Sequence, residues 1–477
     1  MFCQVSYNNK DALKCQYQNK YQLASPNSLI QFDKKHWCYF HCPIKNTEGI
    51  SSEKSKWNEQ IIKNFYSDLD ILINFHVENK KSDIDLSYTV FPNHAMRSDF
   101  IERLTSHRIV TRFDSCKFYG KIDLSKKDFS NFNFSNAHFY ELISLVNCEI
   151  SNTYFFNAKF FGGSSFISCT FVNCSFEKSN FYKSAVFTES HFFNLTTMEE
   201  ESNLNNATFH EDVFFNNSVF DPKFTFKNLT FSKLADFSFS ESCLVKKNFI
   251  GNIFYSIKFE NCKFEEVNFN NRIFKSTTDF SSCVFNKAPY FFNCIFHQHT
   301  IFPPQKNFKD THSKSAAHAY RALYRAMSDL RDRGYESMFY ALIQKSERKS
   351  GIQPFHVRIA SWLYEKITNY GQDIGMPLLW LLVITLLFSL CYAMLKSPII
   401  NFSASINWAI IGNGIDTSIK QIVKPFSFYS DSGNTFFNSL TTTDRVYFKI
   451  FAISQTIFSW SLITLFLLSM RWKFKKD

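Results

Sequence analysis

A phenylalanine recurs every five residues through the middle of this chain, and this spacing restricts the fold more than any other feature. The clearest run is Phe254, Phe259, Phe264, Phe269 and Phe274. A period of five matches neither the 3.6 residues of a helical turn nor the simple alternation of a strand. The chain has 59 phenylalanines but only 12 glycines in 477 residues, so the rings need a common structural cause.

The residue two positions before each ring carries a second signal, because it is often small. Cys169, Cys174, Cys262 and Cys283 each stand two positions before a phenylalanine. One large and one small inward residue in every five allow a chain that turns at regular corners to close around a filled axis. The rings predicted to form this core include Phe118, Phe134, Phe139, Phe171, Phe176, Phe259, Phe264, Phe269 and Phe285.

With this pattern the chain resembles the pentapeptide-repeat family, whose unit is written A-(D/N)-L-x-x. The segment Phe259-Glu-Asn-Cys-Lys-Phe264 carries the phenylalanine-centred form of that unit. The resemblance covers residues 113–303 and implies a mainly β fold, a right-handed quadrilateral β-helix. In such a solenoid four pentapeptides, about 20 residues, make one turn, and each turn stacks on its neighbours.

Before the repeats the chain is rich in cysteine and histidine. Cys3, Cys15, Cys38 and His41 form a loose Cys…Cys…Cys-x2-His set in a segment too short to bury its own core. Thiolate and imidazole are the ligands of structural zinc, and the set resembles an amino-terminal element of some membrane-anchored pentapeptide-repeat proteins. These residues are therefore candidate ligands of one structural zinc, the only cofactor suggested. Ordinary reduced cysteines remain the alternative, since Cys38 and Cys42 lie at helical spacing.

The remainder of the chain divides by helical period and hydropathy. Apolar residues three or four apart after Pro304 predict a helical hairpin. Two later segments reach the length of about 20 apolar residues that crosses a bilayer. The expected regions are a Cys/His-rich segment (1–56), an amino-terminal cap of the solenoid (57–112), the β-helix (113–303), a helical hairpin (311–350), a juxtamembrane linker (351–375), a first transmembrane helix (376–396), an external loop (397–445), a second transmembrane helix (446–470) and a basic cytoplasmic tail (471–477).

Basic residues flank the two apolar segments on their outer sides. Lys345, Arg348 and Lys349 precede the first segment, and Arg471 and Lys473 follow the second, whereas basic residues are sparse between them. The positive-inside rule then predicts a multi-pass protein of the cell (inner) membrane with both termini in the cytoplasm. The net charge of +11 lies mainly beside these segments, which argues against a nucleic-acid partner.

No catalytic motif stands out, since the sequence lacks a Walker loop, a Rossmann fingerprint, a Gly-x-Ser-x-Gly elbow and a His-Glu-x-x-His pair. We expect a non-enzymatic, homo-oligomeric interaction platform or sensor that is anchored in the lipid bilayer and binds an unknown protein on its solenoid. The ending Leu468–Phe474 resembles the carboxyl-terminal module of membrane-associated pentapeptide-repeat proteins, some relatives of which look like two-span ion channels. The alternative is therefore an oligomeric channel or pore-forming effector gated by the solenoid. Its pore-lining candidates are Ser454, Gln455, Ser461 and Thr464.

Overall fold

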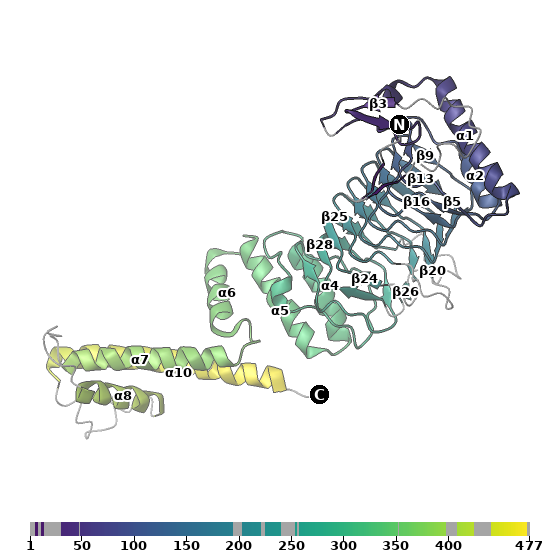
Figure 1. The fold of residues 1–477 in the computed structure, drawn as a ribbon. Helices are drawn as coiled ribbons and strands as arrows, with labels where there is room; N and C mark the ends of the chain where they lie inside the picture. The colour runs from purple at the N-terminus through teal and green to yellow at the C-terminus, as the bar shows by residue number, and fades with distance from the viewer. Residues whose placement is uncertain are drawn as a thin grey trace. The chain divides into compact units, whose positions relative to one another are not determined.

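The protein divides into two compact units, Met1–Asp310 and Thr311–Asp477. The first unit consists mostly of short parallel strands, and the second is helical, as the computed structural model shows (Figure 1). These two features confirm the coarse prediction of a mainly β region followed by a helical one. The structure describes residues 5–7, 11–13, 30–46, 48–193, 203–220, 225–239, 253–254, 257–351, 353–396, 408–423 and 440–474.

The first unit opens with two antiparallel strand pairs and two helices. The Asn58 side chain accepts a hydrogen bond from the Ile61 N–H and so caps helix α1. The buried face of α1 includes Phe65 and Leu69, and this helix contacts α2. The elements here are β1 (Val5–Tyr7), β2 (Asp11–Leu13), β3 (Ile30–Phe32), β4 (Lys35–Trp37), the 3-10 helix η1 (Glu53–Lys56), α1 (Glu59–Glu78), β5 (Asp83–Asp85), β6 (Val90–Phe91), α2 (Ser98–Ser106) and β7 (Val110–Arg112).

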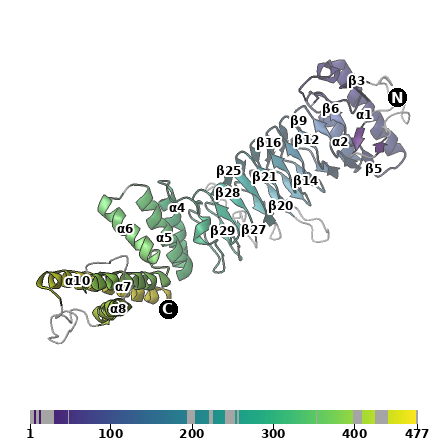
Figure 2. The ribbon, with the colours of Figure 1, turned by 60° about the vertical axis from the view of Figure 1, so that its left-hand side comes forward.

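Short strands that pair in parallel follow, and Figure 2 shows them side by side. We call the described part of residues 90–308 the strand stack. Its further strands are β8 (Lys117–Phe118), β9 (Ile122–Asp123), β10 (Phe129–Ser130), β11 (Phe132–Asn133), β12 (His138–Phe139), β13 (Ile143–Val146), β14 (Glu149–Ser151), β15 (Lys159–Phe160), β16 (Ser164–Ile167), β17 (Thr170–Val172), β18 (Asn180–Phe181), β19 (Ala185–Val186), β20 (His191–Phe193), β21 (Thr208–Phe209), β22 (Val213–Phe214), β23 (Val219–Phe220), β24 (Thr225–Lys227), β25 (Thr230–Asp236), β26 (Ile253–Phe254), β27 (Lys258–Glu260), β28 (Lys263–Asn268), β29 (Ile273–Phe274) and β30 (Val284–Phe285).

The strand register has a constant repeat in the regular part of the stack. Phe118 pairs with Phe139, Phe139 with Phe160, and Phe160 with Phe181. Asparagines that bond between successive levels are likewise 21 residues apart. The expectation of 20 residues per turn is therefore wrong here. One step between successive inward residues is six residues long instead of five, as between Phe160 and Phe166.

Buried rings lie directly above one another along the strand stack. The rings of Phe139 and Phe160 are 4.9 Å apart and nearly parallel, and those of Phe160 and Phe181 are 4.5 Å apart. Such offset stacks are favourable beyond the area that they bury. The core of the first unit is therefore a set of ring columns, in which each level supports the next.

Asparagines turn many of the corners between strands. Asn136, Asn152, Asn157 and Asn173 have φ between 46° and 57°, the left-handed region that asparagine tolerates better than most residues. Their side chains also join levels, because the Asn157 Nδ2 donates to the Asn136 Oδ1 at 2.7 Å and the Asn173 Nδ2 donates to the Asn152 Oδ1 at 3.3 Å. Each corner is thus fixed both by its backbone conformation and by its neighbour.

The second unit contains three amphipathic helices before its apolar ones. The α5 helix (Arg333–Lys349) is capped by Asp332 and contacts α4 (Ala316–Asp329). An ion pair between Arg348 and Glu365 joins α5 to α6 (Phe355–Thr368). The helical hairpin α4–α5 lies within the expected range 311–350.

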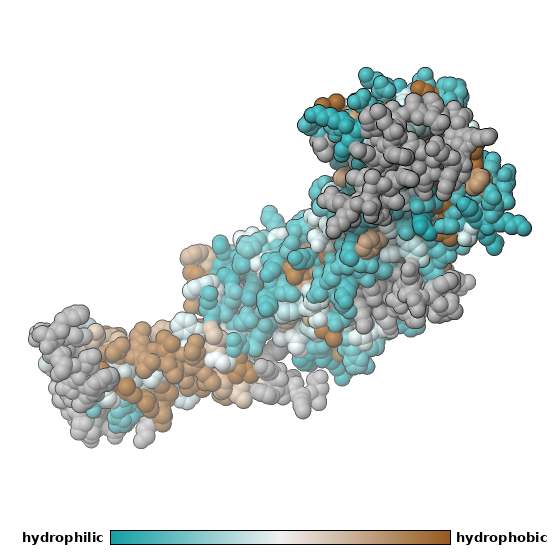
Figure 3. Space-filling model, viewed as in Figure 1, coloured by the Kyte–Doolittle hydropathy of each residue, from teal (hydrophilic) through white to brown (hydrophobic). Residues whose placement is uncertain are grey.

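Within the described residues that follow α6, the second unit has three apolar helices. The helices α7 (Gly375–Lys396), α8 (Trp408–Val423) and α10 (Thr442–Phe474) contact one another, and we call them the helix trio. Two of them, over Gly375–Leu395 and Thr442–Arg471, are long and apolar enough to cross a membrane. This finding confirms the two apolar spans read from the sequence, and Figure 3 shows hydrophobic residues covering this part of the surface.

Two helices lie where the sequence indicates none. The α6 helix lies inside the linker 351–375, and α8 lies inside the external loop 397–445. The prediction of a loop is therefore wrong for residues 408–423. Asp416 and Lys420 lower the hydropathy of α8, and its 16 residues are too few for a spanning segment.

Candidate functional site

Two of the four predicted zinc ligands meet in the first unit. The Cys38 Sγ lies 3.0 Å from the His41 Nδ1, and both residues are buried. A turn brings them together, because the His41 N–H donates to the Cys38 carbonyl oxygen. Cys3 and Cys15 lie outside the described residues. The structure thus places half of the proposed quartet.

The distance between the Cys38 and His41 atoms can be compared with that in a zinc site. Zinc–sulfur and zinc–nitrogen bonds of about 2.3 and 2.0–2.1 Å set two ligand atoms roughly 3.5 Å apart, which is somewhat more than the 3.0 Å between Cys38 Sγ and His41 Nδ1. Among the described residues, no group of three potential metal ligands is found. A complete site would need thiols from the segment that precedes β3.

A buried lysine lies beside this pair, and sequence reasoning missed it. The Lys54 Nζ donates to the carbonyl oxygens of Tyr39 and Phe40 at 2.9 and 3.1 Å, and it lies 4.7 Å from the centre of the Trp57 ring. Burial lowers the pKa of Lys54 to about 7, although the nearby thiols of Cys42 and Cys38 oppose the shift. Its sequence context, between Glu53 and Ser55, reads as an exposed polar run and gives no signal of burial.

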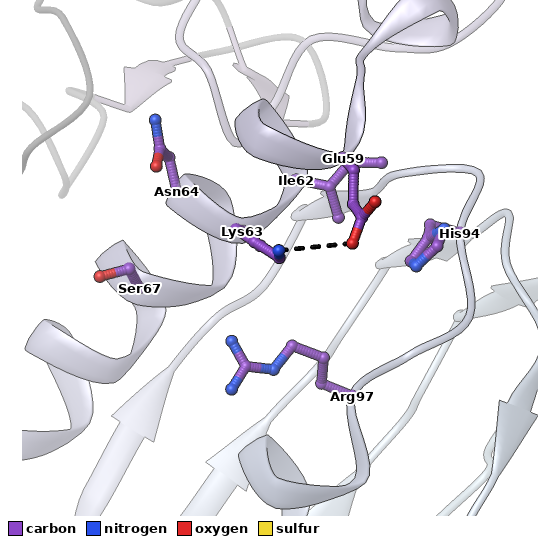
Figure 4. Close-up of a pocket in the computed structure, with 7 residues that line it drawn as sticks. All are labelled: Glu59, Ile62, Lys63, Asn64, Ser67, His94 and Arg97. Carbon is purple, nitrogen blue, oxygen red and sulfur yellow. Dashed lines mark ion pairs between the residues drawn. The ribbon is translucent and has the colours of Figure 1, made fainter.

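A pocket of about 520 Å³ lies between α1 and the segment before α2. Figure 4 shows Glu59 and Lys63 on the helix, opposite His94 and Arg97. Glu59 pairs with Lys63 at 3.4 Å, and the Arg97 Nε donates to the Asp99 Oδ1 at 3.0 Å. The charged groups that line this pocket therefore already have partners on their own segments.

The structure buries all nine rings that the sequence assigns to the core. The small inward residues have a role beyond their size, because many donate to a carbonyl oxygen one level away. The Cys169 Sγ donates to the Leu145 oxygen at 2.9 Å, and the Ser190 Oγ donates to the Phe166 oxygen at 2.7 Å. Burial raises the pKa of the Cys174 thiol to about 12, so this thiol stays protonated at neutral pH.

One inward position holds an arginine where other levels hold a small residue. Arg272 stands two positions before Phe274 and is fully buried. Its Nε donates to the Phe237 oxygen at 2.5 Å, and its Nη1 donates to the Ser218 oxygen at 3.0 Å. Burial lowers its pKa to about 9. These two acceptors belong to two different levels, so Arg272 ties the levels of the stack together.

A second column of rings lies on the outside of the strand stack. Tyr119, Tyr140, Phe161, Tyr182 and His210 stack in order, with ring centres 4.2, 5.1, 4.8 and 4.7 Å apart. We call these five residues the outer aromatic ladder. Four of them are half-buried, and Tyr182 is exposed. The ladder combines apolar rings with tyrosine hydroxyl groups along one face, a surface suited to protein recognition.

The interior of the helix trio is mixed, because buried polar side chains lie beside an apolar cluster that includes Phe388 and Phe448, while many large apolar side chains are exposed. The Tyr392 hydroxyl donates to the Gln455 Oε1 at 3.0 Å, and the Gln455 Nε2 donates to the Ser418 Oγ at 2.6 Å. The Ser418 Oγ in turn donates to the Thr385 oxygen at 2.9 Å. We call this chain of bonds the polar seam. The outward side chains of α7 are apolar and exposed, and we call those of Leu379, Leu382, Leu386 and Leu390 the leucine face.

The four pore-lining candidates do not gather on one face. Gln455 is buried in the polar seam, and Ser454 is half-buried. Ser461 and Thr464 lie toward the outside, and their hydroxyls donate to carbonyl oxygens of their own helix. Within a single chain, Gln455 therefore joins helices, whereas Ser461 and Thr464 face outward.

A comparison of the chain with protein families and with curated proteins finds no match.

Proposed function

We propose that this chain is a membrane-anchored pentapeptide-repeat protein whose strand stack is a right-handed quadrilateral β-helix. Parallel pairing at a constant interval supports this fold, as do corners with left-handed asparagines. Four buried inward residues per turn, such as Phe160, Phe166, Phe171 and Phe176, fit four sides. Stacked turns of this kind give a stiff surface that repeats at a fixed spacing.

The proposed function is a non-enzymatic interaction platform held at the membrane. The observation that carries it is the apolar surface of the helix trio, where leucines such as Leu386 are exposed while Gln455 and Ser418 bond to each other inside. Such a surface is unfavourable in water, because many large apolar side chains stay exposed. In a bilayer the same arrangement places the leucines of α7 against lipid and lets the buried polar groups bond between helices.

In the proposed topology both chain ends lie in the cytoplasm of a cell-membrane protein, because basic residues flank the outer ends of the two spans. The strand stack then faces the cytoplasm, with the outer aromatic ladder open to a protein partner. A structural zinc on Cys38 and His41, completed by Cys3 and Cys15, would stabilise the amino-terminal cap.

A photo-crosslinking side chain in place of Tyr182 tests the platform in the full-length, membrane-bound protein. Phe193 is exposed to a similar extent on another strand and serves as the matched control site. We expect a discrete protein adduct from position 182 that is absent from position 193 and is lost when Tyr140 and Phe161 become alanine. Identical products from both positions would contradict the proposal.

A second candidate function is an oligomeric pore gated by the solenoid. The polar residues of α8 favour it, because Asp416 and Lys420 lie on a helix that packs against the middle of α7. Recording from purified protein in planar bilayers tests this candidate. Reproducible conductance would support it, and a silent bilayer that contains correctly inserted protein would contradict it.

A further inference from the structure

The α8 helix carries a polar stripe on its outward face. Asn413, Asp416 and Lys420 are spaced three and four residues apart, which places them on one side of a helix. All three are exposed, and the Asp416 and Lys420 side chains are 60% and 67% accessible. They form an ion pair of 2.6 Å with each other. Their side chains form no hydrogen bond or ion pair with any described residue outside α8.

The depth of this stripe follows from the contacts of α8 with α7. The Ser418 Oγ donates to the carbonyl oxygen of Thr385, which is the middle residue of the apolar segment Gly375–Leu395. A Cβ on Gly414 would overlap the Ser389 carbonyl oxygen, so the two backbones approach closely there. If α7 spans the bilayer, Ser418 lies at the midplane. Asp416 and Lys420 then lie within about one helical turn, ~5 Å, of it.

A lipid-facing stripe of this kind is unfavourable. A charge at the centre of a membrane helix is costly, and the internal ion pair offsets only part of that cost. Intramembrane charges accordingly face protein or water rather than lipid.

We propose that the α8 face formed by Asn413, Asp416 and Lys420 packs against the same face of further copies of this chain. Copies arranged around an axis along the membrane normal bring Asp416 of one copy and Lys420 of its neighbour to similar depths. Each charge then has an opposite charge on both its own chain and the next, which makes the face complementary to itself. The leucine face of α7 stays toward lipid. This inference rests on the proposed membrane insertion and adds the surface through which the oligomer forms.

Disulfide crosslinking of the full-length protein in membranes tests the face directly. Asn413→Cys should give a crosslinked dimer on mild oxidation. Leu386→Cys is the matched control, because this exposed α7 residue lies next to Thr385 at the same depth but on the leucine face. The inference would be overturned if Asn413→Cys gave no more dimer than the wild type and the control.

Charge variants supply an independent test in mild detergent. Asp416→Lys should convert the oligomer to monomer, and the double variant Asp416→Lys with Lys420→Asp should restore it. An oligomer unaffected by Asp416→Lys would overturn the inference.

Alkaline carbonate extraction distinguishes the proposed membrane insertion from the proposed α8 interface. Release of the wild-type protein from membranes would refute membrane insertion itself. A retained wild type that does not crosslink through residue 413 would refute only the α8 face.

Discussion

The strand stack and the helix trio expose different surfaces. In the strand stack, rings such as Phe160 and Phe181 face inward, and the corner asparagines Asn136 and Asn157 are partly accessible to water. In the helix trio, Gln455 and Ser418 are inside, and Leu386 is outside. Both regions bury apolar side chains, such as Phe388 and Phe448 in the trio, but the trio also exposes leucines along α7. The difference fits the proposal that the stack folds against water and the trio against lipid.

The largest effect is expected from the ring column. Phe181 stacks between Phe160 and Phe209, with ring centres 4.5 and 4.7 Å away. Phe181→Ala should lower the free energy of unfolding of the stack by about 3–5 kcal/mol, because it leaves a cavity between two levels. Urea unfolding followed by circular dichroism measures the change. The neighbouring outward substitution Tyr182→Ala should cost about 1 kcal/mol or less, and equal losses from the two variants would undermine the inside–outside distinction.

A charge on the leucine face tests the other half of the comparison. Leu386→Lys places an ammonium group at the middle of α7 and should disfavour membrane insertion by about 3 kcal/mol. The fraction of protein that stays in the membrane after carbonate extraction should fall, whereas Leu386→Met should leave it unchanged. Phe193→Lys places the same charge on an exposed residue of the strand stack and should also leave it unchanged. Full retention of Leu386→Lys would show that this face does not meet lipid.

The buried Lys54 predicts a pH dependence of the amino-terminal cap. Its pKa is about 7 in the folded protein and about 10.4 in an unfolded chain. Between these values the unfolded chain binds one more proton, so this residue makes stability rise with pH, by up to about 1.4 kcal/mol per pH unit. Below pH 7 both states bind the proton, and the full penalty of the buried charge applies.

Hydrogen exchange of α1, compared between wild type and Lys54→Met at matched pH from about 6 to 8.5, measures this contribution. The wild type should gain protection relative to the variant as pH rises. Lys63→Met, a change at an exposed lysine on α1, is the control and should follow the wild type. Parallel pH profiles for wild type and Lys54→Met would show that folding does not lower the pKa of Lys54.

The smallest effect is expected from the polar seam. Gln455→Leu removes the hydrogen bonds to Tyr392 and Ser418. Interhelical hydrogen bonds in membranes contribute on average ~0.6 kcal/mol and at most about 1.7. The variant should therefore unfold slightly earlier in a detergent titration, while Ser461→Leu, on the outward face, should have no effect. A loss of several kcal/mol would indicate that Gln455 does more than join helices.

Much of the strand stack could be predicted from the sequence, because the inward rings mostly recur every five residues, a pattern that is visible locally. The exact register could not, since the six-residue step between Phe160 and Phe166 reads as an irregularity unless the strand pairing is known. Arg272 was also beyond prediction, because its acceptors lie 35 and 54 residues away in the chain. Long-range contacts of this kind leave no local pattern.

The candidate sites were less predictable than the fold. Cys38 and His41 are three residues apart, and one turn brings their side chains together. Their proximity could therefore be predicted from the sequence. Lys54 joins them from a separate 3-10 helix, and its neighbours in sequence are polar. The α8 helix was missed because hydropathy averages over both faces, so its charged stripe concealed the side that packs on α7.

The ring columns continue across unequal lengths of chain. Phe181 stacks on Phe209 at 4.7 Å, and Phe231 stacks on Phe264 at 5.0 Å. The partners in each of these pairs are further apart in the sequence than Phe160 and Phe181 are. Even so, both ring distances match those between neighbouring levels in the regular part of the stack. Extra segments can therefore enter between levels without disturbing the column. Such a scaffold gives evolution, or a protein engineer, sites where new recognition loops can be grafted while the framework keeps its periodicity.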